Sequence, residues 1–246
     1  ALGFDAVATG HHARLVANAN GDMRVHRGAD DAKDQSYVVH MLAGRELQRT
    51  LFPVGNMTKA EVRKEAERLG LRTASKPDSQ DVCFITSTGG RETFLGDRIP
   101  FHPAKVVDMA GKQVGEVDSV EMVTIGQRRG LGIGGLGDPL YVVKLDPETK
   151  RVIVGPKEAL STRTIPLREI NWLGDTPFDS RAEWHLSVKV RSTRPPRPAV
   201  IRPLSATEAE VELLDPEDGV SAGQACVFYA PEGGRVFGGG WIWRGR

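Results

Sequence analysis

The most constraining feature of this sequence is its C-terminal half, where short β-type runs are separated by Gly, Pro and Asp. The segment 184–190 alternates strictly, with Trp, Leu and Val on one face and His, Ser and Lys on the other. Such a period of two is typical of a half-buried strand. Several short strands at this spacing predict a small β-barrel in about the last 85 residues. The other strands are expected at 198–204, 207–214, 223–230 and 235–244, and a separate hairpin at 141–145 and 151–154.

The first residues indicate a different kind of structure. Residues 4–10 have the pattern of a short buried strand that ends at a glycine, Gly10. In doubly wound α/β sheets, ligands bind at the carboxyl ends of strands. The polar residues that follow, His11, His12 and Arg14, could therefore face a ligand. The alternative is an ordinary exit from a strand, with histidines on the surface.

A polar segment at 28–36 is followed by apolar residues, from Tyr37 to Leu42, that lie about one helical turn apart. This spacing predicts a helix capped by Asp34 or Ser36. The backbone N–H groups at the start of such a helix would suit an anion. The alternative is a solvated cap without a ligand.

A second helix is predicted between Thr58 and Gly70. Thr58 and Glu61 have the spacing of a capping box, and a glycine is the usual residue just beyond a helix end. The surroundings of this helix are rich in Lys and Arg, which fits either a solvated helix face or a surface that meets nucleic acid.

The composition excludes several classes of protein. The 33 basic and 32 acidic residues leave a net charge of +1, so any nucleic-acid site must be a local patch. No apolar run approaches ~18 residues, which argues against a membrane-spanning helix. Two cysteines are too few for a disulfide scaffold or a Cys-rich zinc site, and they fit a reducing compartment such as the cytoplasm. The chain starts without an initiator Met or a signal peptide, and we expect it to begin inside a larger protein.

One of the two cysteines, Cys83, lies in the polar and apolar sequence Ser-Gln-Asp-Val-Cys-Phe-Ile. A thiol in such a setting could be a positioned nucleophile or sulfur carrier if its surroundings are electropositive. A small core residue is the commoner role of a cysteine beside Val, Phe and Ile. The residues alone leave both open.

The segment 125–135 is dense in glycine but lacks the Gly-Lys-Ser/Thr ending of a nucleotide phosphate loop. We therefore exclude a Walker-type site here. The segment could let the backbone approach RNA, with Arg128 and Arg129 on phosphates, or it could be a simple glycine-rich turn.

The clearest cationic run lies in the predicted barrel. The 14 residues from Lys189 to Arg202 carry five cations and no acid. On a barrel edge such a run would attract a phosphate backbone. Its members are Lys189, Arg191, Arg194, Arg197 and Arg202.

Taken together, these segments resemble the tRNA-specific 2-thiouridylases, the MnmA family. The motifs follow one another in family order along essentially the whole chain. They lie at 8–14, 28–37, 51–55, 78–85, 126–135, 140–143 and 223–225.

The resemblance implies an architecture of α/β plus β type. A Rossmann-like ATP-pyrophosphatase domain, of which this chain holds the C-terminal remnant, would be followed by a small central domain and a C-terminal β-barrel. The expected boundaries are 1–48, 49–160 and 161–246.

The resemblance also implies a reaction. Members of the family thiolate the wobble uridine of tRNA at C2: ATP, with Mg²⁺, adenylates the C2 oxygen, and a cysteine persulfide delivers sulfur. A second cysteine then forms a disulfide with the first or assists hydrosulfide release. The sulfur itself would come from a donor such as a cysteine desulfurase or a sulfur-relay protein.

The family's functional residues carry over by motif. Cys83 matches the persulfide cysteine, and Gly10 matches a glycine at the ATP site, where a missing side chain permits close backbone approach. The positions that match tRNA contacts are His11, Lys33, Asp34, Gln35, Arg191, Ser192 and Gln224. Lys would supply charge, and Gln can pair with base or sugar edges.

The chain departs from the family pattern in one respect. It contains neither the Ser-Gly-Gly-x-Asp-Ser phosphate loop nor the other catalytic cysteine. We therefore expect this chain alone to be inactive, although its parent would be a tRNA-uridine 2-sulfurtransferase. The alternative is a tRNA-binding fragment without an activity of its own.

Overall fold

A computed structural model describes residues 3–76, 85, 90–134, 137–179 and 182–243. The chain divides into two compact units. The first unit joins residues 1–76 to 163–215 and 221–246, and the second comprises 77–162 and 216–220. The three expected domain boundaries stay a prediction.

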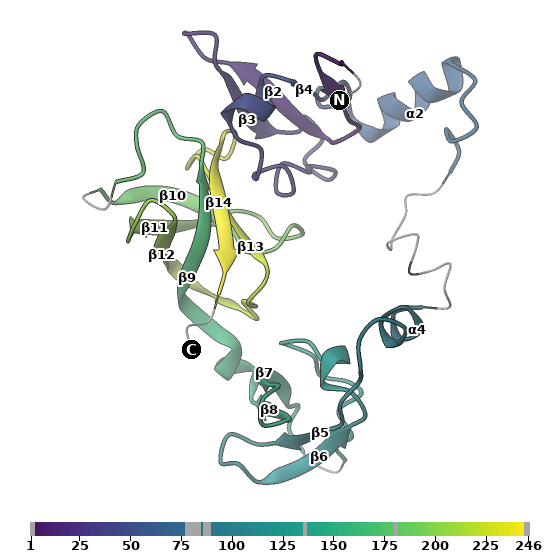
Figure 1. Ribbon diagram of the computed structural model, residues 1–246, viewed down its shortest axis with the longest axis vertical. Helices are drawn as coiled ribbons and strands as arrows, with labels where there is room; N and C mark the ends of the chain where they lie inside the picture. The colour runs from purple at the N-terminus through teal and green to yellow at the C-terminus, as the bar shows by residue number, and fades with distance from the viewer. Residues whose placement is uncertain (1–2, 77–84, 86–89, 135–136, 180–181, 244–246) are drawn as a thin grey trace. The chain divides into compact units, whose positions relative to one another are not determined.

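The C-terminal part of the first unit is a closed six-stranded β-barrel, which confirms the expected fold class (Figure 1). Neighbouring strands follow the order β10-β11-β12-β9-β14-β13. Four of the strand ranges expected between 198 and 244 are observed, and β9 is an additional long strand. The strands are β9 (Ser161–Trp172), β10 (Trp184–Lys189), β11 (Arg197–Pro203), β12 (Glu208–Asp218), β13 (Ala225–Tyr229) and β14 (Val236–Ile242).

Glycines allow β14 to approach its neighbours closely. Gly238 has a φ of +110°, and a Cβ there would collide with the carbonyl oxygen of Asn171 in β9. A Cβ at Gly239 would lie 2.5 Å from the carbonyl oxygen of Cys226 in β13. Only glycine combines this backbone conformation with this proximity.

The N-terminal part of the first unit contains small elements. An antiparallel hairpin is formed by β2 (Ala13–Ala17) and β3 (Met23–Arg27), and a parallel pair by β1 (Val7–Ala8) and β4 (Thr50–Leu51). The expected buried strand at 4–10 was wrong in extent and burial. Among the described residues β1 pairs with β4 alone, and Phe4 and Val7 are 76% and 62% exposed.

The helix expected at 37–42 was also wrong. The segment forms successive turns, in which the Val38 N–H donates to Gln35 and the Leu42 N–H to Val39. Tyr37 and Val39 are both buried, whereas Val38 is exposed. Residues two apart cannot share one face of an α-helix, so packing of both side chains requires a non-helical backbone.

The N-terminal segment packs on the outside of the barrel. A single buried cluster combines Tyr37 and Val39 with residues of β13 and β14, including Val227 and Val236. The Tyr37 hydroxyl donates to the carbonyl oxygen of Ala225 at 2.8 Å. The barrel therefore has a partly covered outer wall at β13 and β14. β10 is buried on both faces from Leu186 onward, and its Lys189 contacts Asp34 of the N-terminal part.

Two α-helices follow in the N-terminal part: α1 (Gly44–Leu47) and α2 (Lys59–Arg68). The predicted capping box of α2 is confirmed: the Thr58 hydroxyl accepts from the Glu61 N–H, and the Glu61 carboxylate accepts from the Thr58 N–H. Gly70, with a φ of +66°, follows the helix end as expected.

The second unit is built on a four-stranded sheet of order β6-β5-β8-β7. Its strands are β5 (Ala104–Val107), β6 (Gln113–Val117), β7 (Tyr141–Asp146) and β8 (Arg151–Gly155), and β7 with β8 confirms the predicted hairpin. Short helices among the described residues of this unit include α4 (Arg91–Gly96), η1 (Val120–Met122) and η2 (Lys157–Leu160). In the glycine-rich segment, Gly126, Gly130 and Gly132 have positive φ, as tight turns require.

Candidate nucleic-acid interface

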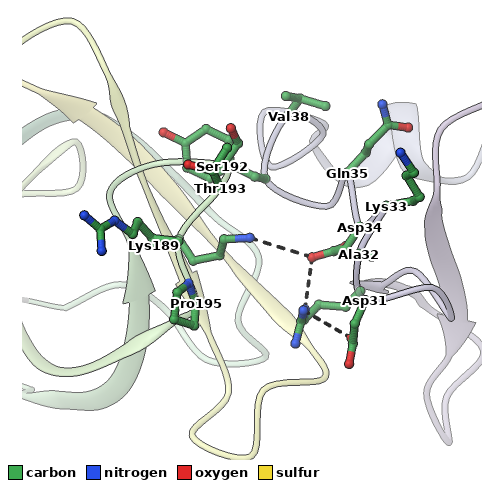
Figure 2. Close-up of a pocket in the computed structure, with 13 residues that line it drawn as sticks. Asp31, Ala32, Lys33, Asp34, Gln35, Val38, Lys189, Ser192, Thr193 and Pro195 are labelled. Carbon is green, nitrogen blue, oxygen red and sulfur yellow. Dashed lines mark hydrogen bonds and ion pairs between the residues drawn. The ribbon is translucent and has the colours of Figure 1, made fainter. Parts of the chain in front are cut away.

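A pocket of about 580 Å³ opens in the first unit between two loops that are distant in sequence. One loop, residues 31–35, belongs to the N-terminal part, and the other, residues 192–195, follows β10 of the barrel (Figure 2). Four of the predicted tRNA contacts therefore line one cavity. They are Lys33, Asp34, Gln35 and Ser192.

Asx-type hydrogen bonds shape the first loop. The Asp30 carboxylate accepts from the Ala32 N–H at 3.1 Å and from the Lys59 N–H, at the start of α2, at 2.9 Å. The backbone N–H of Lys33 donates to the carbonyl oxygen of Asp30. These bonds close a turn that presents the exposed side chain of Lys33.

Asp34 lies at the floor of the pocket with its side chain only 1% exposed. Its carboxylate accepts from the N–H groups of Gly28 and Ser36 and from Arg27 Nε, at 3.0–3.1 Å. Burial alone would raise the pKa of this carboxyl, but the hydrogen bonds from Ser36, Arg27 and Gly28 outweigh it and lower the pKa below its usual value. Asp34 is therefore ionised and directed inward.

Lys189, from β10, faces Asp34 across the pocket floor. Its Nζ atom lies 4.0 Å from Asp34 Oδ2, and its side chain is 5% exposed (Figure 2). Burial lowers the pKa of Lys189, and the charge of Asp34 opposes that shift. The floor thus holds the Asp34 carboxylate between two cations, Arg27 and Lys189, and Arg27 also pairs with Asp31 at 3.2 Å.

Gln35 is held by two hydrogen bonds to the backbone of His12, which directly precedes β2 of the N-terminal hairpin. Its Oε1 atom accepts from the backbone N–H of His12 at 3.0 Å, and its own N–H donates to the His12 carbonyl oxygen. Because a backbone N–H can only donate, the amide oxygen must face His12. The Gln35 Nε2 group is the end that remains to be offered to a ligand.

The cationic run from Lys189 to Arg202 does not form one continuous patch, so that expectation was wrong. Lys189 is buried against Asp34, and Arg202 binds Glu183 and Glu212 at 2.7 and 2.8 Å. The fold brings acids from other segments to both ends of the run. Arg194, in the middle, lines the pocket.

The remaining predicted residues lie elsewhere. Gly10 and His11 follow β1, where the His11 ring is hydrogen-bonded to the Thr9 hydroxyl at 2.8 Å. Gln224 is exposed in the turn before β13, and Arg191 is half-buried directly after β10. None of these four lines the pocket. Cys83 lies outside the described residues.

The described residues near Gly10 fit the ATP and Mg²⁺ that the resemblance implies only in part. A Cβ at Gly10 would meet nothing within 4 Å, so the backbone there is open to close approach. The hydroxyl and imidazole beside it are bonded to each other and supply no phosphate-binding cation. In the described part of the chain, no group of three His, Cys, Asp or Glu side chains is suited to a metal ion. These residues fit a backbone contact to a nucleotide but no phosphate or metal site.

Two features that position the pocket have no local signal in the sequence. Asp175, after β9, accepts hydrogen bonds from Arg24 in β3 and from Arg235 beside β14. The Ser36 hydroxyl lies 3.2 Å from the hydroxyl of buried Tyr229. Both join the N-terminal part to the barrel across more than a hundred residues of sequence. The sequence offers one indication of a contact here, because the alternating pattern of β10 places Lys189 on the outer face of the barrel.

Among the described residues, no helix is both long and apolar enough to cross a membrane. Cys226 is a free, fully buried thiol in β13, and burial raises its pKa.

Three family models match successive parts of the chain. Residues 1–87 match a tRNA methyl transferase HUP domain, and residues 92–156 a tRNA methyl transferase PRC-barrel domain. Residues 162–242 match an aminomethyltransferase beta-barrel domain. The third match coincides closely with the six-stranded barrel.

Curated relatives are similar along nearly the whole chain. Proteins named tRNA-specific 2-thiouridylase MnmA from Jannaschia sp. and Cereibacter sphaeroides are each 57% identical over 99% of this chain. The MnmA of Ruegeria pomeroyi is 54% identical over 99%. The chain spans 64 to 65% of the length of these relatives. On this similarity, and on the three domain matches in order, the chain belongs to the family of tRNA-specific 2-thiouridylases, MnmA.

Proposed function

We propose that this chain supplies the tRNA-recognition part of an enzyme that thiolates the wobble uridine of tRNA at C2. The observation that carries this proposal is the pocket between the loops 31–35 and 192–195. It unites motif residues that are more than 150 positions apart in sequence, at a site with positive charge. Relatives over the same span carry the name tRNA-specific 2-thiouridylase.

The pocket residues divide into two kinds of RNA contact. Lys33 and Arg194 at the rim carry charge that suits phosphate groups, and such contacts position an RNA without reading its sequence. Gln35 offers an amide N–H₂ group that can donate to an acceptor on a base or a ribose. His11, Arg191 and Gln224 would extend the contact beyond the pocket.

The chemistry of the proposed enzyme centres on Cys83. Its thiolate would accept sulfur as a persulfide from a donor such as a cysteine desulfurase or a sulfur-relay protein. ATP, with Mg²⁺, would supply the activation that turns the C2 oxygen of uridine into a leaving group. Gly10 is the residue of this chain proposed to meet that nucleotide, through its open backbone. We place this reaction in the cytoplasm.

A binding experiment tests the recognition part directly. Gel-shift titrations of the chain with tRNA and with a duplex DNA of similar length, at three salt concentrations, should show tighter binding to tRNA. Affinity should fall linearly with log salt, by roughly 0.7 to 0.9 per phosphate contact. Equal affinity for both nucleic acids without salt dependence would contradict the proposal.

Two substitutions separate the kinds of contact. Arg191→Ala should weaken binding to all tRNAs similarly and reduce the salt slope by about one contact. Gln35→Ala should leave the slope unchanged and reduce discrimination among RNAs. The opposite pattern would show that the roles are misassigned.

The catalytic part is tested in the full-length protein. Cys83→Ser should abolish 2-thiouridine formation, measured by mass spectrometry of digested tRNA, while tRNA affinity stays within a few-fold of wild type. Undiminished thiolation would exclude Cys83 as the sulfur acceptor. If the full-length wild type binds tRNA but forms no 2-thiouridine with ATP and a sulfur donor, the alternative of a binding protein without activity holds.

A further inference from the structure

The pocket floor contains a cluster of buried ionic side chains, whereas Lys33 at the rim is exposed. Asp34 Oδ2 accepts from Arg27 Nε at 3.0 Å and lies 4.0 Å from Lys189 Nζ. The side chains of Asp34 and Lys189 are 1% and 5% exposed. Lys189 comes from the barrel and Asp34 from the N-terminal loop, so the pair joins the two walls of the pocket.

The acceptor capacity of Asp34 is committed to the protein. Oδ1 accepts from the N–H groups of Gly28 and Ser36, and Oδ2 accepts from the Ser36 hydroxyl as well as from Arg27. A carboxylate has about four such positions. A group of RNA that approaches the pocket therefore finds no vacant lone pair on Asp34.

The residues on either side of Asp34 face differently. Figure 2 shows Asp34 directed across to Lys189, whereas Lys33 and Gln35 extend toward the top of the view, away from the ion pair. Residues 31–33 form a turn, and the Gln35 N–H donates to the His12 carbonyl oxygen. Because the N–H groups of Gly28 and Ser36 hold the Asp34 carboxylate from inside, they set the course of the backbone that carries Lys33 and Gln35.

We propose that Asp34 and Lys189 are positioning residues: their buried ion pair ties the loop 31–35 to the barrel and thereby orients Lys33 and Gln35 for RNA, while neither member touches the RNA. The inference rests on the proposed function. It reassigns Asp34 from an RNA contact to a support of its neighbours. It also explains why a barrel strand carries a lysine on a covered face, since a buried ion pair defines one geometry more than it adds stability.

The test compares three variants of the chain with wild type: Lys189→Met, Asp34→Asn and the double variant. Lys189→Met should weaken tRNA binding by about 5- to 150-fold, the usual range for a coupled site, without changing the salt slope. Asp34→Asn turns an N–H₂ group toward donors that now bind a carboxylate oxygen, so it should weaken tRNA binding at least as much as Lys189→Met, and its melting temperature checks that it folds. The double variant should bind no worse than the poorer single variant, because the two residues act as one unit.

A matched control is Arg202→Met, which removes a barrel cation that is paired with Glu183 and Glu212 instead. It should leave tRNA affinity within about twofold of wild type. Hydrogen exchange supplies a readout without RNA. The Gly28 and Ser36 amides, which donate to Asp34, should exchange faster in Lys189→Met and not in Arg202→Met.

Each other outcome overturns the inference. A salt slope reduced by 0.7 to 0.9 in Lys189→Met would mean that Lys189 binds a phosphate directly. Unchanged tRNA affinity with a lower melting temperature would mean that the pair is merely structural. Additive losses in the double variant would mean that the residues act separately. If wild type itself shows no preference for tRNA over DNA, the proposed function fails. If wild type prefers tRNA and Lys189→Met binds tRNA with the same affinity as wild type, only the positioning role fails.

Discussion

We predict that the ion pairs of Asp175 stabilise the attachment of the N-terminal hairpin to the barrel. Asp175 Oδ1 accepts from Arg24 Nε and Nη2 at 2.9 and 2.7 Å, and Oδ2 accepts from Arg235 Nη1 at 2.5 Å. Arg24 belongs to the N-terminal hairpin and Arg235 to the barrel. Asp175→Asn removes the charge and turns an N–H₂ group toward one of the guanidinium groups. This variant should loosen the attachment of the hairpin to the barrel.

The magnitude follows from the pKa. The hydrogen bonds from Arg235 and then Arg24 lower the pKa of Asp175 from its usual 3.8 to about 2. One pKa unit corresponds to about 1.4 kcal/mol, so the full shift would be worth about 2.5 kcal/mol. The Asp175 side chain is 49% exposed, and solvent screening reduces an exposed pair strongly. We therefore expect Asp175→Asn to lower the free energy of unfolding by about 1 kcal/mol at pH 7.

The pH dependence has a defined sign. Because the pKa is lowered in the folded state, the stabilisation is fully present above the pKa of the unfolded chain, near 4. It is lost as the pH falls from there toward about 2. The difference between wild type and Asp175→Asn should therefore shrink through that window.

Urea unfolding followed by tryptophan fluorescence, in steps from pH 7 to pH 3, measures both quantities. Asp5→Asn is the control, since Asp5 is an exposed carboxylate of the same unit and the substitution changes the net charge equally. The reasoning is refuted if Asp175→Asn costs no more than Asp5→Asn at pH 7. It is also refuted if the cost stays constant down to pH 3.

Three further substitutions test the barrel and its covered wall. Gly238→Ala should destabilise the chain by about 1–3 kcal/mol more than Gly223→Ala in urea unfolding, because both have positive φ but only Gly238 meets a backbone carbonyl; equal costs would contradict this. Tyr37→Phe should cost about 1–2 kcal/mol through loss of the buried hydrogen bond to Ala225, and a thermally neutral variant would show that this bond contributes nothing. Cys226→Ser should leave 2-thiouridine formation by the full-length protein intact and cost at most about 1–3 kcal/mol, since it buries a hydroxyl in place of a thiol; loss of the modification would give Cys226 a role in catalysis.

The barrel could be predicted because its information is local. Strand by strand, the period of two and the Gly and Pro residues between runs set the ranges of β10 to β14 closely. What the alternation could not show is the covering of the outer wall. His185, Ser187 and Lys189 occupy one face of β10, yet only His185 is exposed. Burial of Lys189 involves Asp34, which is 155 residues earlier in the chain.

The helix expected at 37–42 failed for a related reason. The apolar spacing of Tyr37 and Val38 with Met41 fits a helix, but the barrel buries Tyr37 and Val39 and leaves Val38 and Met41 exposed. Tertiary packing buries a different set of residues from the set that the local hydrophobic period indicated. The hydrophobic period of a single segment carries no information about contacts with a distant part of the chain.

The candidate site was recognisable by motif and not by charge. The family resemblance selected Lys33, Gln35 and Ser192, which the fold brings to one pocket. The five cations and no acids between Lys189 and Arg202 predicted a continuous cationic patch, and this prediction was wrong. Asp34 and Glu212 lie outside that window of sequence and neutralise its two ends. Charge in a sequence window equals charge on a surface only when no other segment packs there.

The attachment of the N-terminal segment to the far end of the chain bears on synthesis in the cell. Ser36 and Tyr37 find their partners 193 and 188 residues later, at Tyr229 and Ala225. At about 5–20 residues per second, a ribosome needs roughly 10 to 40 s to cover that distance. Throughout that interval the apolar side of this segment has no barrel to pack on, so nascent chains stalled before Ala225 should be cut by protease near residues 36–42, and chains released at full length should resist. Folding of this part is thus timed by the synthesis of β13 and β14.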